Sequence, residues 1–418
     1  MKKVIIILII FSLVFISFFV FKKDEEIENK NISVILETEE GNIKSKVFPS
    51  KSEYEYDKVV CENTSNNVDV TFDEEEWKLD LSVEEESIDG NFNCTVYFKE
   101  KSKIASDVIV RKYTENNNDG LIRITQSQTE QTPELTEYRY SGSNEEVKNY
   151  VNFNNETWRI IGVSPVNDGS GTYEERMKII RNSSIGSYSW DTSGSSLNTG
   201  SGSNQWGASG SYTGSDLMRL LNTGLYYNRT SGTCYVGKTN ATKSCNFTST
   251  GLTEEAKNMI GDAKWYTAAI YGNNLNYTTS TLYGVERGST VGVSDIGMTI
   301  TKTISWTGKI GITYLSDYGY ASDGCRNGEQ TLSYYSNETC TSTNWMYDST
   351  SMLWTISALR MSGQETGRYR VAYINSNGSV YGRSTYDAVG IKPTVYLKPE
   401  IEIISGDGTK DNPYNLSL

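Results

Sequence analysis

The sequence predicts an α+β protein: an N-terminal membrane helix, a small all-β sandwich, and a larger α+β domain with two short helices. Three observations predict this architecture. An apolar run opens the chain, short strand patterns separated by turn residues fill most of the rest, and only two segments combine an N-cap residue with helical spacing of apolar side chains. The length of 418 residues suits about two or three domains.

The first 23 residues form the predicted anchor. Residues 4–21 (VIIILIIFSLVFISFFVF) are apolar apart from Ser12 and Ser17, and lysines flank the run on both sides. As a helix the run would measure about 27 Å, close to the hydrocarbon core of a bilayer at about 30 Å. A cleaved signal peptide normally ends in small residues, whereas here large apolar residues continue up to Lys22. We therefore favour an uncleaved signal anchor over a removed signal peptide. We therefore expect a single-pass protein of the cell membrane with the bulk of the chain extracellular.

The six cysteines fall into three local couples, which are Cys61 with Cys94, Cys234 with Cys245, and Cys325 with Cys340. The intervals lack the CxxC spacing of zinc and redox sites, so three disulfides in an oxidising compartment are the plainer interpretation. The pairing is inferred from proximity and even number alone, and the sequence leaves other connectivities open. If all six are paired, no thiol remains for nucleophilic catalysis.

Composition and strand patterns divide the chain behind the anchor. We expect a polar tether (24–34), a disulfide-pinned β-sandwich module (35–101), a linker (102–140), a larger domain (141–400) and a C-terminal tail (401–418). In the larger domain, Ser215 precedes the helical pattern DLMRLLN and Thr253 precedes EEAKNMIGDAKW. Both are N-cap residues in front of an apolar stripe, and they give the two predicted helices.

Four motifs in the larger domain carry a family resemblance: WRIIGV (158–163), WTGKIGITYLSDYGY (306–320), WTIS (354–357) and GIKPTVYLKP (390–399). With them the domain resembles an uncharacterised domain of membrane-anchored or secreted proteins of Gram-positive bacteria. That domain belongs to the C-type-lectin-like fold group, which includes formylglycine-generating-enzyme-like domains. The resemblance implies a C-type-lectin-like fold in which an exposed Asn-Gly hairpin and the closing strand support a ligand face. Lys392 stands where that strand usually has arginine.

The same resemblance implies that the enzymatic activity of the group is absent. Formylglycine-generating enzymes hold copper with a cysteine pair near their C-terminal end, and this chain has no cysteine after Cys340. The chain also has no histidine, which excludes imidazole-dependent triads and HExxH zinc sites. We expect no cofactor. Calcium is left open by Asp317, Asp323 and Glu329, although their spacing fits no defined cation loop.

The charge balance argues against nucleic acid as a partner. Aspartate and glutamate number 52 against 39 lysines and arginines, which gives a formal net charge of -13. Attraction to a phosphate backbone needs a clustered basic face. We therefore expect the partners to be the membrane, through the N-terminal helix, and an extracellular glycan or protein ligand.

Residues 357–390 mix arginine and tyrosine with small polar residues, a composition typical of recognition surfaces. Asn377 and Gly378 predict a tight hairpin turn in this segment. The candidate ligand-binding residues here are Arg360, Tyr369, Arg370, Tyr373, Asn375, Tyr381, Arg383 and Tyr386. Trp345 and Trp206, in polar loops, are candidates for stacking on a ligand. The alternative is a hairpin with packed tyrosines and no ligand.

These observations predict a non-enzymatic cell-surface binding or adhesion protein that recognises a glycan or protein ligand. One alternative is a carboxylate-dependent enzyme acting on envelope glycans, with Glu254 and Glu255 or Glu174 and Glu175 as candidate pairs. It requires two acidic side chains with mutually perturbed pKa values in one cleft. A second alternative is a purely structural envelope protein, which would lack a concave, aromatic-rich patch.

Overall fold

The computed structural model describes residues 30–62, 68–83, 92–116, 119–129, 132–192, 204–208, 213–267, 270–271, 275–287, 305–327, 330–360 and 370–418. The chain divides into two compact units, Met1–Ser102 and Lys103–Leu418. Strands account for 46% of the structure and helices for 14%, and the sheets include mixed ones.

The predicted fold class is therefore wrong: the chain is mostly β and lacks support for an N-terminal membrane helix. None of the described helices is both long and apolar enough to cross a membrane. The predicted anchor at residues 1–23 lies outside the described residues. The strand content was underestimated because several strands are only three or four residues long and rich in serine, threonine or charged residues, which hides period-two alternation.

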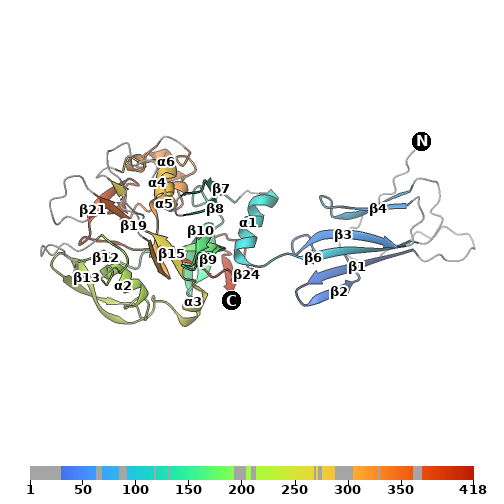
Figure 1. Ribbon diagram of the computed structural model, residues 1–418, viewed down its shortest axis with the longest axis horizontal. Coiled ribbons are helices and arrows are strands. Elements are labelled where there is room, and N and C mark those ends of the chain that lie inside the picture. The colour runs from blue at the N-terminus through green and yellow to red at the C-terminus, as the bar shows by residue number, and fades with distance from the viewer. Residues whose placement is uncertain are drawn as a thin grey trace, which may run out of the picture. The chain divides into compact units, whose positions relative to one another are not determined.

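The first unit contains six described strands. They are β1 (Lys30–Thr38), β2 (Gly41–Ser45), β3 (Tyr54–Glu62), β4 (Val68–Asp73), β5 (Lys78–Val83) and β6 (Phe92–Glu100). One sheet has the order β2-β1-β6-β3, with β1 and β6 parallel, while β4 and β5 form a separate antiparallel pair (Figure 1). Phe98 of β6 meets Phe72 of β4 edge to face, with ring centroids 5.2 Å apart, and Trp77 packs beside both. The two sheets therefore share one aromatic core.

The second unit contains helices that cover and connect its sheets. They are α1 (Ala105–Asn116), α2 (Asp216–Asn222), α3 (Glu254–Met259), α4 (Thr279–Val285), α5 (Leu315–Tyr320), the 3-10 helix η2 (Leu332–Tyr334) and α6 (Glu338–Ser342). The two predicted helices correspond to α2 and α3. As their sequences predict, the side chain of Ser215 accepts a hydrogen bond from Met218 N, and that of Thr253 accepts one from Ala256 N. Of the further helices, α1 has 12 residues and buries Ala105 and Ile109, whereas α4, α5, η2 and α6 have seven residues or fewer.

The larger of the two main sheets of this unit has nine described strands. Its strands are β7 (Leu121–Gln126), β8 (Leu135–Tyr140), β9 (Tyr150–Phe153), β10 (Glu156–Asn167), β11 (Tyr173–Arg181), β18 (Ile310–Ile312), β23 (Pro393–Tyr396), β24 (Glu402–Ser405) and β25 (Tyr414–Ser417). The main order is β18-β23-β11-β10-β9-β25-β24, and the β7-β8 hairpin joins through β10. Only β25 and β9 are parallel among the described pairs of this sheet.

A second sheet carries the segment singled out as a recognition surface. Its strands are β12 (Ser187–Ser189), β16 (Ile270–Tyr271), β19 (Leu353–Arg360), β20 (Arg370–Ile374), β21 (Val380–Ser384) and β22 (Ala388–Gly390). The order is β12-β22-β19-β20-β21, with β16 beside β19. Two hairpin-like pairs complete the unit, β13 (Ser231–Gly237) with β14 (Ala241–Asn246) and β15 (Ala263–Tyr266) with β17 (Ser305–Gly308).

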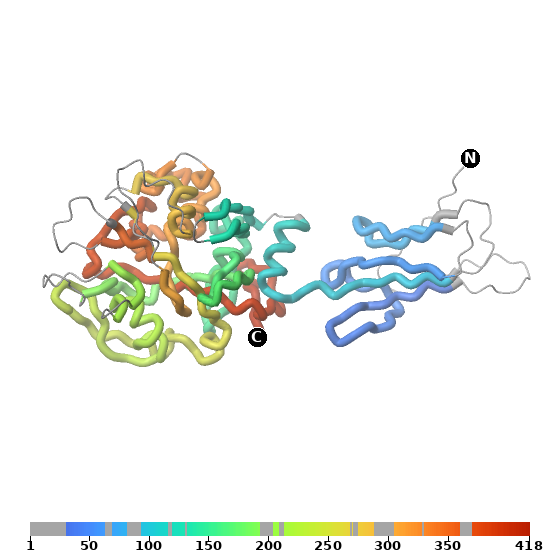
Figure 2. The backbone as a smooth tube through the Cα atoms, in the orientation of Figure 1, coloured from blue at the N-terminus to red at the C-terminus, as the bar shows by residue number. Residues whose placement is uncertain are grey.

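The segments predicted as a linker (102–140) and as a tail (401–418) take part in the folded unit. The backbone N–H of Ala105, at the start of α1, donates to the carbonyl of Ile401. In Figure 2 α1, in cyan, lies beside the red C-terminal segment that contains β24. Ile109 of α1 and Leu121 of β7 are buried in the main core. Both ends of the unit are therefore built into it.

All three disulfides have the predicted pairing. Cys61 and Cys94 stand opposite each other on β3 and β6, and the second bridge links β13 to β14. The third connects Cys325, in the turn after α5, to Cys340 of α6. Each bridge thus joins segments that are also close in sequence.

We expect the Cys61–Cys94 bridge to stabilise the first unit. Replacing both residues with serine should lower the free energy of unfolding of that unit by about 2–5 kcal/mol, because the unfolded chain regains loop entropy. Hydrogen exchange of the β3 and β6 amides measures the effect. The double variant Cys234→Ser/Cys245→Ser is the control and should leave exchange in β3 and β6 unchanged; equal protection in both variants would contradict the expectation.

Candidate functional site

The predicted hairpin forms from β20 and β21. The cross-strand register pairs Tyr373 with Tyr381 and Val371 with Arg383. Side chains that are directly opposite or two positions apart share one face of a sheet, so Tyr373, Tyr381 and Arg383 lie on the same face. We call these three residues the hairpin face. The arrangement brings together three of the residues selected from the sequence.

An aromatic row crosses the sheet toward this face. Trp354 of β19 is the register partner of Tyr373, and the ring centroids of Trp354 and Tyr373, like those of Tyr373 and Tyr381, lie 6.4 Å apart. Trp354 is 1% exposed and Tyr381 is 36% exposed. Among the described strands, β21 is the last in its sheet. The row therefore starts in the core and opens to solvent at the sheet edge.

Arg383 is held beside this row by three contacts. Its guanidinium lies 5.6 Å from the centroid of the Tyr373 ring. Its Nε donates to Asp387 Oδ2 at 3.0 Å, and its Nη1 lies 3.0 Å from the Sδ of Met352. All three contacts keep the planar cation on the aromatic surface, where guanidinium groups stack favourably.

The turn of the hairpin is covered, in contrast to the exposed Asn-Gly hairpin that the family resemblance implies. Gly378 has a φ of +93°, and an added Cβ would lie 2.7 Å from the carbonyl oxygen of Tyr335. The hydroxyl of Tyr318 in α5 donates to the Gly378 carbonyl at 2.8 Å. Only Asn377 is exposed at the tip. The turn is thus anchored against α5 and η2, and the open part of the hairpin is its β21 edge.

The other sequence-selected residues do not join the hairpin face. Asn375 Nδ2 donates to Asn377 Oδ1 and so belongs to the turn. Arg370 points to the opposite face, where its Nη1 donates to the Gly382 carbonyl. Tyr386 lies under Lys238, whose Nζ is 5.8 Å from the ring centroid. Tyr369 and the side chain of Arg360 lie outside the described residues.

The two tryptophans expected on exposed loops are buried. Trp206 is 0% exposed and packs against Trp190, with ring centroids 5.0 Å apart. Trp345 is 5% exposed, and its Nε1 donates to the carbonyl of Tyr140 at 2.8 Å. The prediction that they stand free for stacking is wrong, because their polar sequence neighbours hide a contribution to the core.

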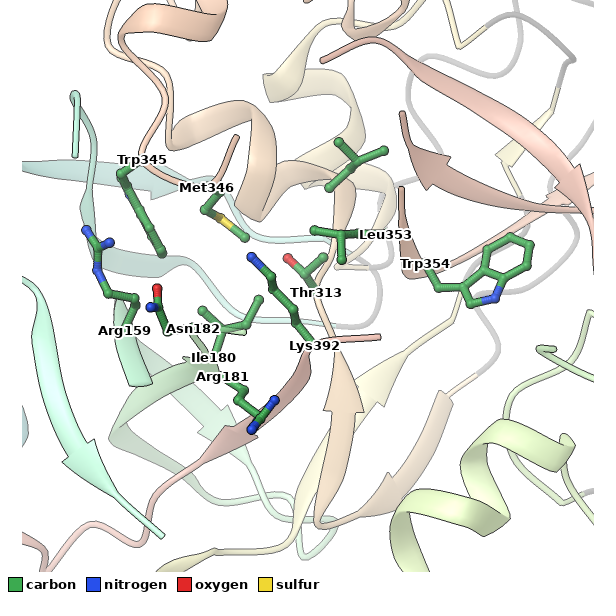
Figure 3. A pocket seen from close by; sticks show the side chains of 11 residues that line it. Arg159, Ile180, Arg181, Asn182, Thr313, Trp345, Met346, Leu353, Trp354 and Lys392 are labelled. Atoms are coloured by element: carbon green, nitrogen blue, oxygen red, sulfur yellow. The ribbon is translucent and has the colours of Figure 1, made fainter. Parts of the chain in front are cut away.

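Trp345 instead borders a recess between the two large sheets. Its walls include Asn182, Ile180, Met346, Leu353 and Lys392. We call it the Lys392 recess. Its cavity volume is about 20 Å³, room for about one water molecule. In Figure 3 the ammonium group of Lys392 points toward Trp345 and Met346, whereas the guanidinium of Arg181 points away from them.

Charged groups around the recess perturb one another. Burial lowers the pKa of Lys392, and the positive charges of Arg159 and Arg181 lower it further, while Asp348 opposes them. Burial also lowers the pKa of Arg159 to about 10. The Arg159 guanidinium lies 3.7 Å from the centroid of Tyr150 and 5.0 Å from that of Trp345.

A separate group of buried charges lies where β8, β11, α4 and α5 meet. It comprises Glu137, Arg139, Lys178, Glu286, Arg287 and Asp317, all at most 5% exposed, and we call it the ionic cluster. Asp317 accepts from Arg139 Nη1 at 2.7 Å and from Lys178 Nζ at 2.6 Å. Glu137 accepts from Arg139 and from Arg287 Nε at 2.9 Å. Three cations thus balance three carboxylates.

Two carboxylates of the ionic cluster have pKa values that are shifted in opposite directions. Burial raises the pKa of Glu286. Burial would also raise the pKa of Asp317, but Lys178 and Arg139 hold it well below its usual range. Opposite shifts of this kind are what an acid/base pair would show.

The hydrogen bonds of Glu286 and Asp317, however, indicate a structural role for both carboxylates. Glu286 accepts from the backbone N–H groups of Leu315 and Ser316 and from the hydroxyl of Ser357. Asp317 is enclosed by its two cations and by the N–H of Tyr314. The polar atoms of both side chains are therefore directed at protein groups.

The carboxylate pairs proposed from sequence also form ion pairs with neighbouring cations. Glu254 pairs with Lys257 at the start of α3, and Glu174 pairs with Arg176. Glu174 and Glu175 are successive residues of β11 and so point to opposite faces. These pairs form no dyad.

The calcium candidates do not converge. Asp317 is committed to the ionic cluster, Asp323 pairs with Arg326, and Glu329 lies outside the described residues. In the part of the chain that the structure describes, no three acidic or sulfur-containing side chains are placed to hold a metal ion. Sequence spacing had put these oxygens near one another, but α5 turns Asp317 inward.

Sequence reasoning did not select Lys392, Arg159 or Asn182, which line the recess between the two large sheets. Arg159 stands inside the apolar strand motif WRIIGV, and Lys392 precedes a proline in the closing strand motif. A long cation inside an apolar strand pattern is the signal that could have found them, because such a residue needs a partner or a cavity.

No protein-family model, curated protein or solved structure matches the chain. The resemblance to C-type-lectin-like domains therefore stays a prediction. Functional inference has to come from the hairpin face, the recess and the ionic cluster themselves.

We expect Asp317→Asn to lower the free energy of unfolding at neutral pH by about 3–5 kcal/mol, because it leaves buried cations without their negative partner. The native pKa of Asp317 lies below its ordinary value of 3.8, so the unfolded chain takes up this proton first. The advantage of the wild type is full above that ordinary value and shrinks as the pH falls through the native pKa. Urea unfolding across this range measures it.

Asp323→Asn is the control for this experiment. Asp323 also pairs with an arginine, but its side chain is 56% exposed. Exposed ion pairs contribute little. Its replacement should leave stability nearly unchanged, and an equal loss in both variants would argue against a special role for the ionic cluster.

Proposed function

We propose that the protein is a non-enzymatic binding protein that works outside the cytosol and contacts a glycan or protein ligand with its hairpin face. The location is supported by the disulfides, which include all six cysteines and which form and persist in oxidising compartments. The same pairing leaves no thiol for covalent catalysis.

The single observation that carries the binding proposal is the aromatic row that ends at Tyr381. Tyrosine offers a rigid contact area with a polar tip at small cost in conformational entropy. Trp354 and Tyr373 fix the base of the row in the core, so Tyr381 and Arg383 are presented on a rigid strand pair rather than on a loose loop. Rigid presentation reduces the entropy lost when a ligand binds.

Arg383 adds a specific polar element to this surface. Its contacts with Asp387, Met352 and Tyr373 leave guanidinium N–H groups for a ligand, since arginine carries five donors. Aromatic and arginine side chains supply most of the energetic hot spots of binding surfaces. The combination suits a ligand with a flat apolar face and an adjacent hydrogen-bond acceptor.

The purely structural alternative is disfavoured by the same feature. A spacer protein has no need to bring a tyrosine row to the open edge of a sheet, where unpaired backbone groups already invite association.

We expect the variant Tyr373→Ala/Tyr381→Ala/Arg383→Ala to lose ligand binding. Glycan-array screening and pull-down from surface extracts would identify the ligand, and titration would follow. Loss of one central aromatic anchor commonly costs about 2 kcal/mol, or about thirtyfold in affinity, so Tyr381→Ala alone should show a clear effect.

Tyr334→Ala provides a matched control, because Tyr334 of η2 is 64% exposed but lies outside the hairpin face. It should bind like the wild type. Circular dichroism would check that the triple variant is folded. Undiminished binding by a folded triple variant would remove the hairpin face from the mechanism.

A further inference from the structure

We propose that a cavity beside α2 is a second binding site and that it takes a phenol, an uncharged aromatic ring with one hydroxyl group. The cavity lies between α2, β12 and the β13-β14 hairpin, and Figure 1 shows these elements together at one end of the second unit. We call it the α2 cavity. Its lining includes Tyr188, Asp216, Arg219, Leu225, Thr233 and Tyr235. Because β12 and β21 are at opposite ends of the described strand order, the α2 cavity is separate from the hairpin face.

The apolar part of the cavity wall is formed by the fold itself. Helix α2 contributes Leu217 and Leu220, and the segment after the helix contributes Leu225. Cys234 is also part of the wall, and its disulfide with Cys245 joins β13 to β14. A wall that exists before the ligand arrives reduces the entropy lost on binding.

The first argument for the ligand is size. The cavity volume is about 150 Å³. An apolar cavity of about this volume accommodates one benzene molecule. The α2 cavity therefore has room for one six-membered ring with a small substituent. An oligosaccharide or a folded protein, the ligands proposed for the hairpin face, could place no more than one ring in it.

The second argument is charge. Asp216 and Arg219 are the charged residues of the cavity wall, and they form an ion pair with each other. Asp216 Oδ2 also accepts from the N–H of Thr192 at 2.8 Å and from its hydroxyl at 2.9 Å. The formal charges of the wall therefore cancel. A charged ligand would lose its hydration without meeting an unpaired opposite charge, whereas a neutral ring avoids that cost.

The third argument is the pair of tyrosines on the wall. Tyr188 is 6% exposed and is held by Phe247, with ring centroids 5.9 Å apart, and by Lys243, whose Nζ lies 4.9 Å from the Tyr188 centroid. Tyr235 of β13 is half-buried. Aromatic rings make favourable edge-to-face and offset contacts with other rings. An aromatic ligand therefore suits this wall better than an aliphatic one of equal size.

The fourth argument is the presence of polar groups for one hydroxyl. The side chain of Arg219 is 41% exposed, and its one hydrogen bond among the described residues is donated by Nη2 to Asp216. Arginine has five N–H donors, so further donors are left for a ligand. Thr233, exposed on β13, adds a hydroxyl that can donate or accept. A phenolic hydroxyl can accept from the arginine and donate to the threonine at the same time.

Binding can be followed at Leu225. We would label the leucine methyl groups with ¹³C, assign Leu225 by the Leu225→Ile variant, and titrate the full chain with p-cresol at pH 7. A phenol is neutral at this pH, because its pKa is about 10. The Leu225 signal should shift in a saturable way. Benzoate and benzylammonium, rings of similar size with a charge, should bind at least about tenfold more weakly.

Two substitutions make the test specific. Thr233→Trp fills part of the cavity from an exposed position and should weaken p-cresol binding by at least about tenfold. Arg219→Met removes the donors and should weaken it by about threefold to tenfold, the range for one net hydrogen bond. Because Arg219→Met leaves Asp216 without this cation, benzylammonium should bind this variant more tightly than the wild type. Ser249→Trp is the matched control, since Ser249 is exposed in the same segment and absent from the cavity wall.

A further ligand distinguishes the two sources of a phenol ring. N-acetyltyrosinamide carries the same ring on a peptide backbone. If it shifts the Leu225 signal as p-cresol does, the occupant is a tyrosine side chain of a protein partner. If p-cresol alone binds, the occupant is a free small molecule. Both outcomes support a phenol site.

The remaining outcomes decide the proposal. Saturable p-cresol binding that is weakened by Thr233→Trp and unchanged in Ser249→Trp supports it. Absence of a saturable shift in the wild type, equal affinity for benzoate or benzylammonium, or unchanged affinity in a folded Thr233→Trp variant overturns it. If Thr233→Trp does not fold, unchanged affinities for p-cresol and benzylammonium in Arg219→Met overturn it. None of these measurements depends on whether the hairpin face binds its own ligand.

Discussion

The buried ion pairs of Asp317 fix the position of the β20-β21 hairpin relative to the nine-stranded sheet. Asp317 belongs to α5, and its partners Arg139 and Lys178 belong to β8 and β11 of the nine-stranded sheet. The next residue, Tyr318, holds the turn of the β20-β21 hairpin through the Gly378 carbonyl. Glu286 of the same cluster reaches Ser357 on β19. The cluster therefore connects the large sheet to the sheet that carries the hairpin face.

This connection is better understood as a specifier of geometry than as a source of stability. Taking six charges out of water costs free energy that their mutual attraction only about repays, so an apolar replacement of matched shape could be as stable. An apolar contact, however, tolerates sliding, whereas an Asp317 that must meet two cations has one position. The next residue, Tyr318, bonds the Gly378 carbonyl, so the hairpin turn is also held in one position.

The parts of the structure that could be predicted are those encoded locally. The caps of α2 and α3, the β20-β21 hairpin and the three disulfides all depend on residues within a few tens of positions of one another. The ionic cluster could not be predicted, because Glu137 and Asp317 are far apart in sequence and each alone looks like a solvated surface charge. Trp345 was misjudged for the same reason, since its partner Tyr140 lies two hundred positions away. The α+β prediction failed where strands such as β12 and β22 are too short to show alternation.

The second unit contains two sets of buried charges that are balanced in different ways. In the ionic cluster, every carboxylate is met by cations or by backbone N–H groups, and the formal charges cancel. At the Lys392 recess, burial and the charges of Arg159 and Arg181 lower the pKa of Lys392, and burial lowers that of Arg159. Because an ammonium taken out of water opposes stability, Lys392 depends on its ion pair with Asp348, at 3.5 Å, to remain charged in the folded protein.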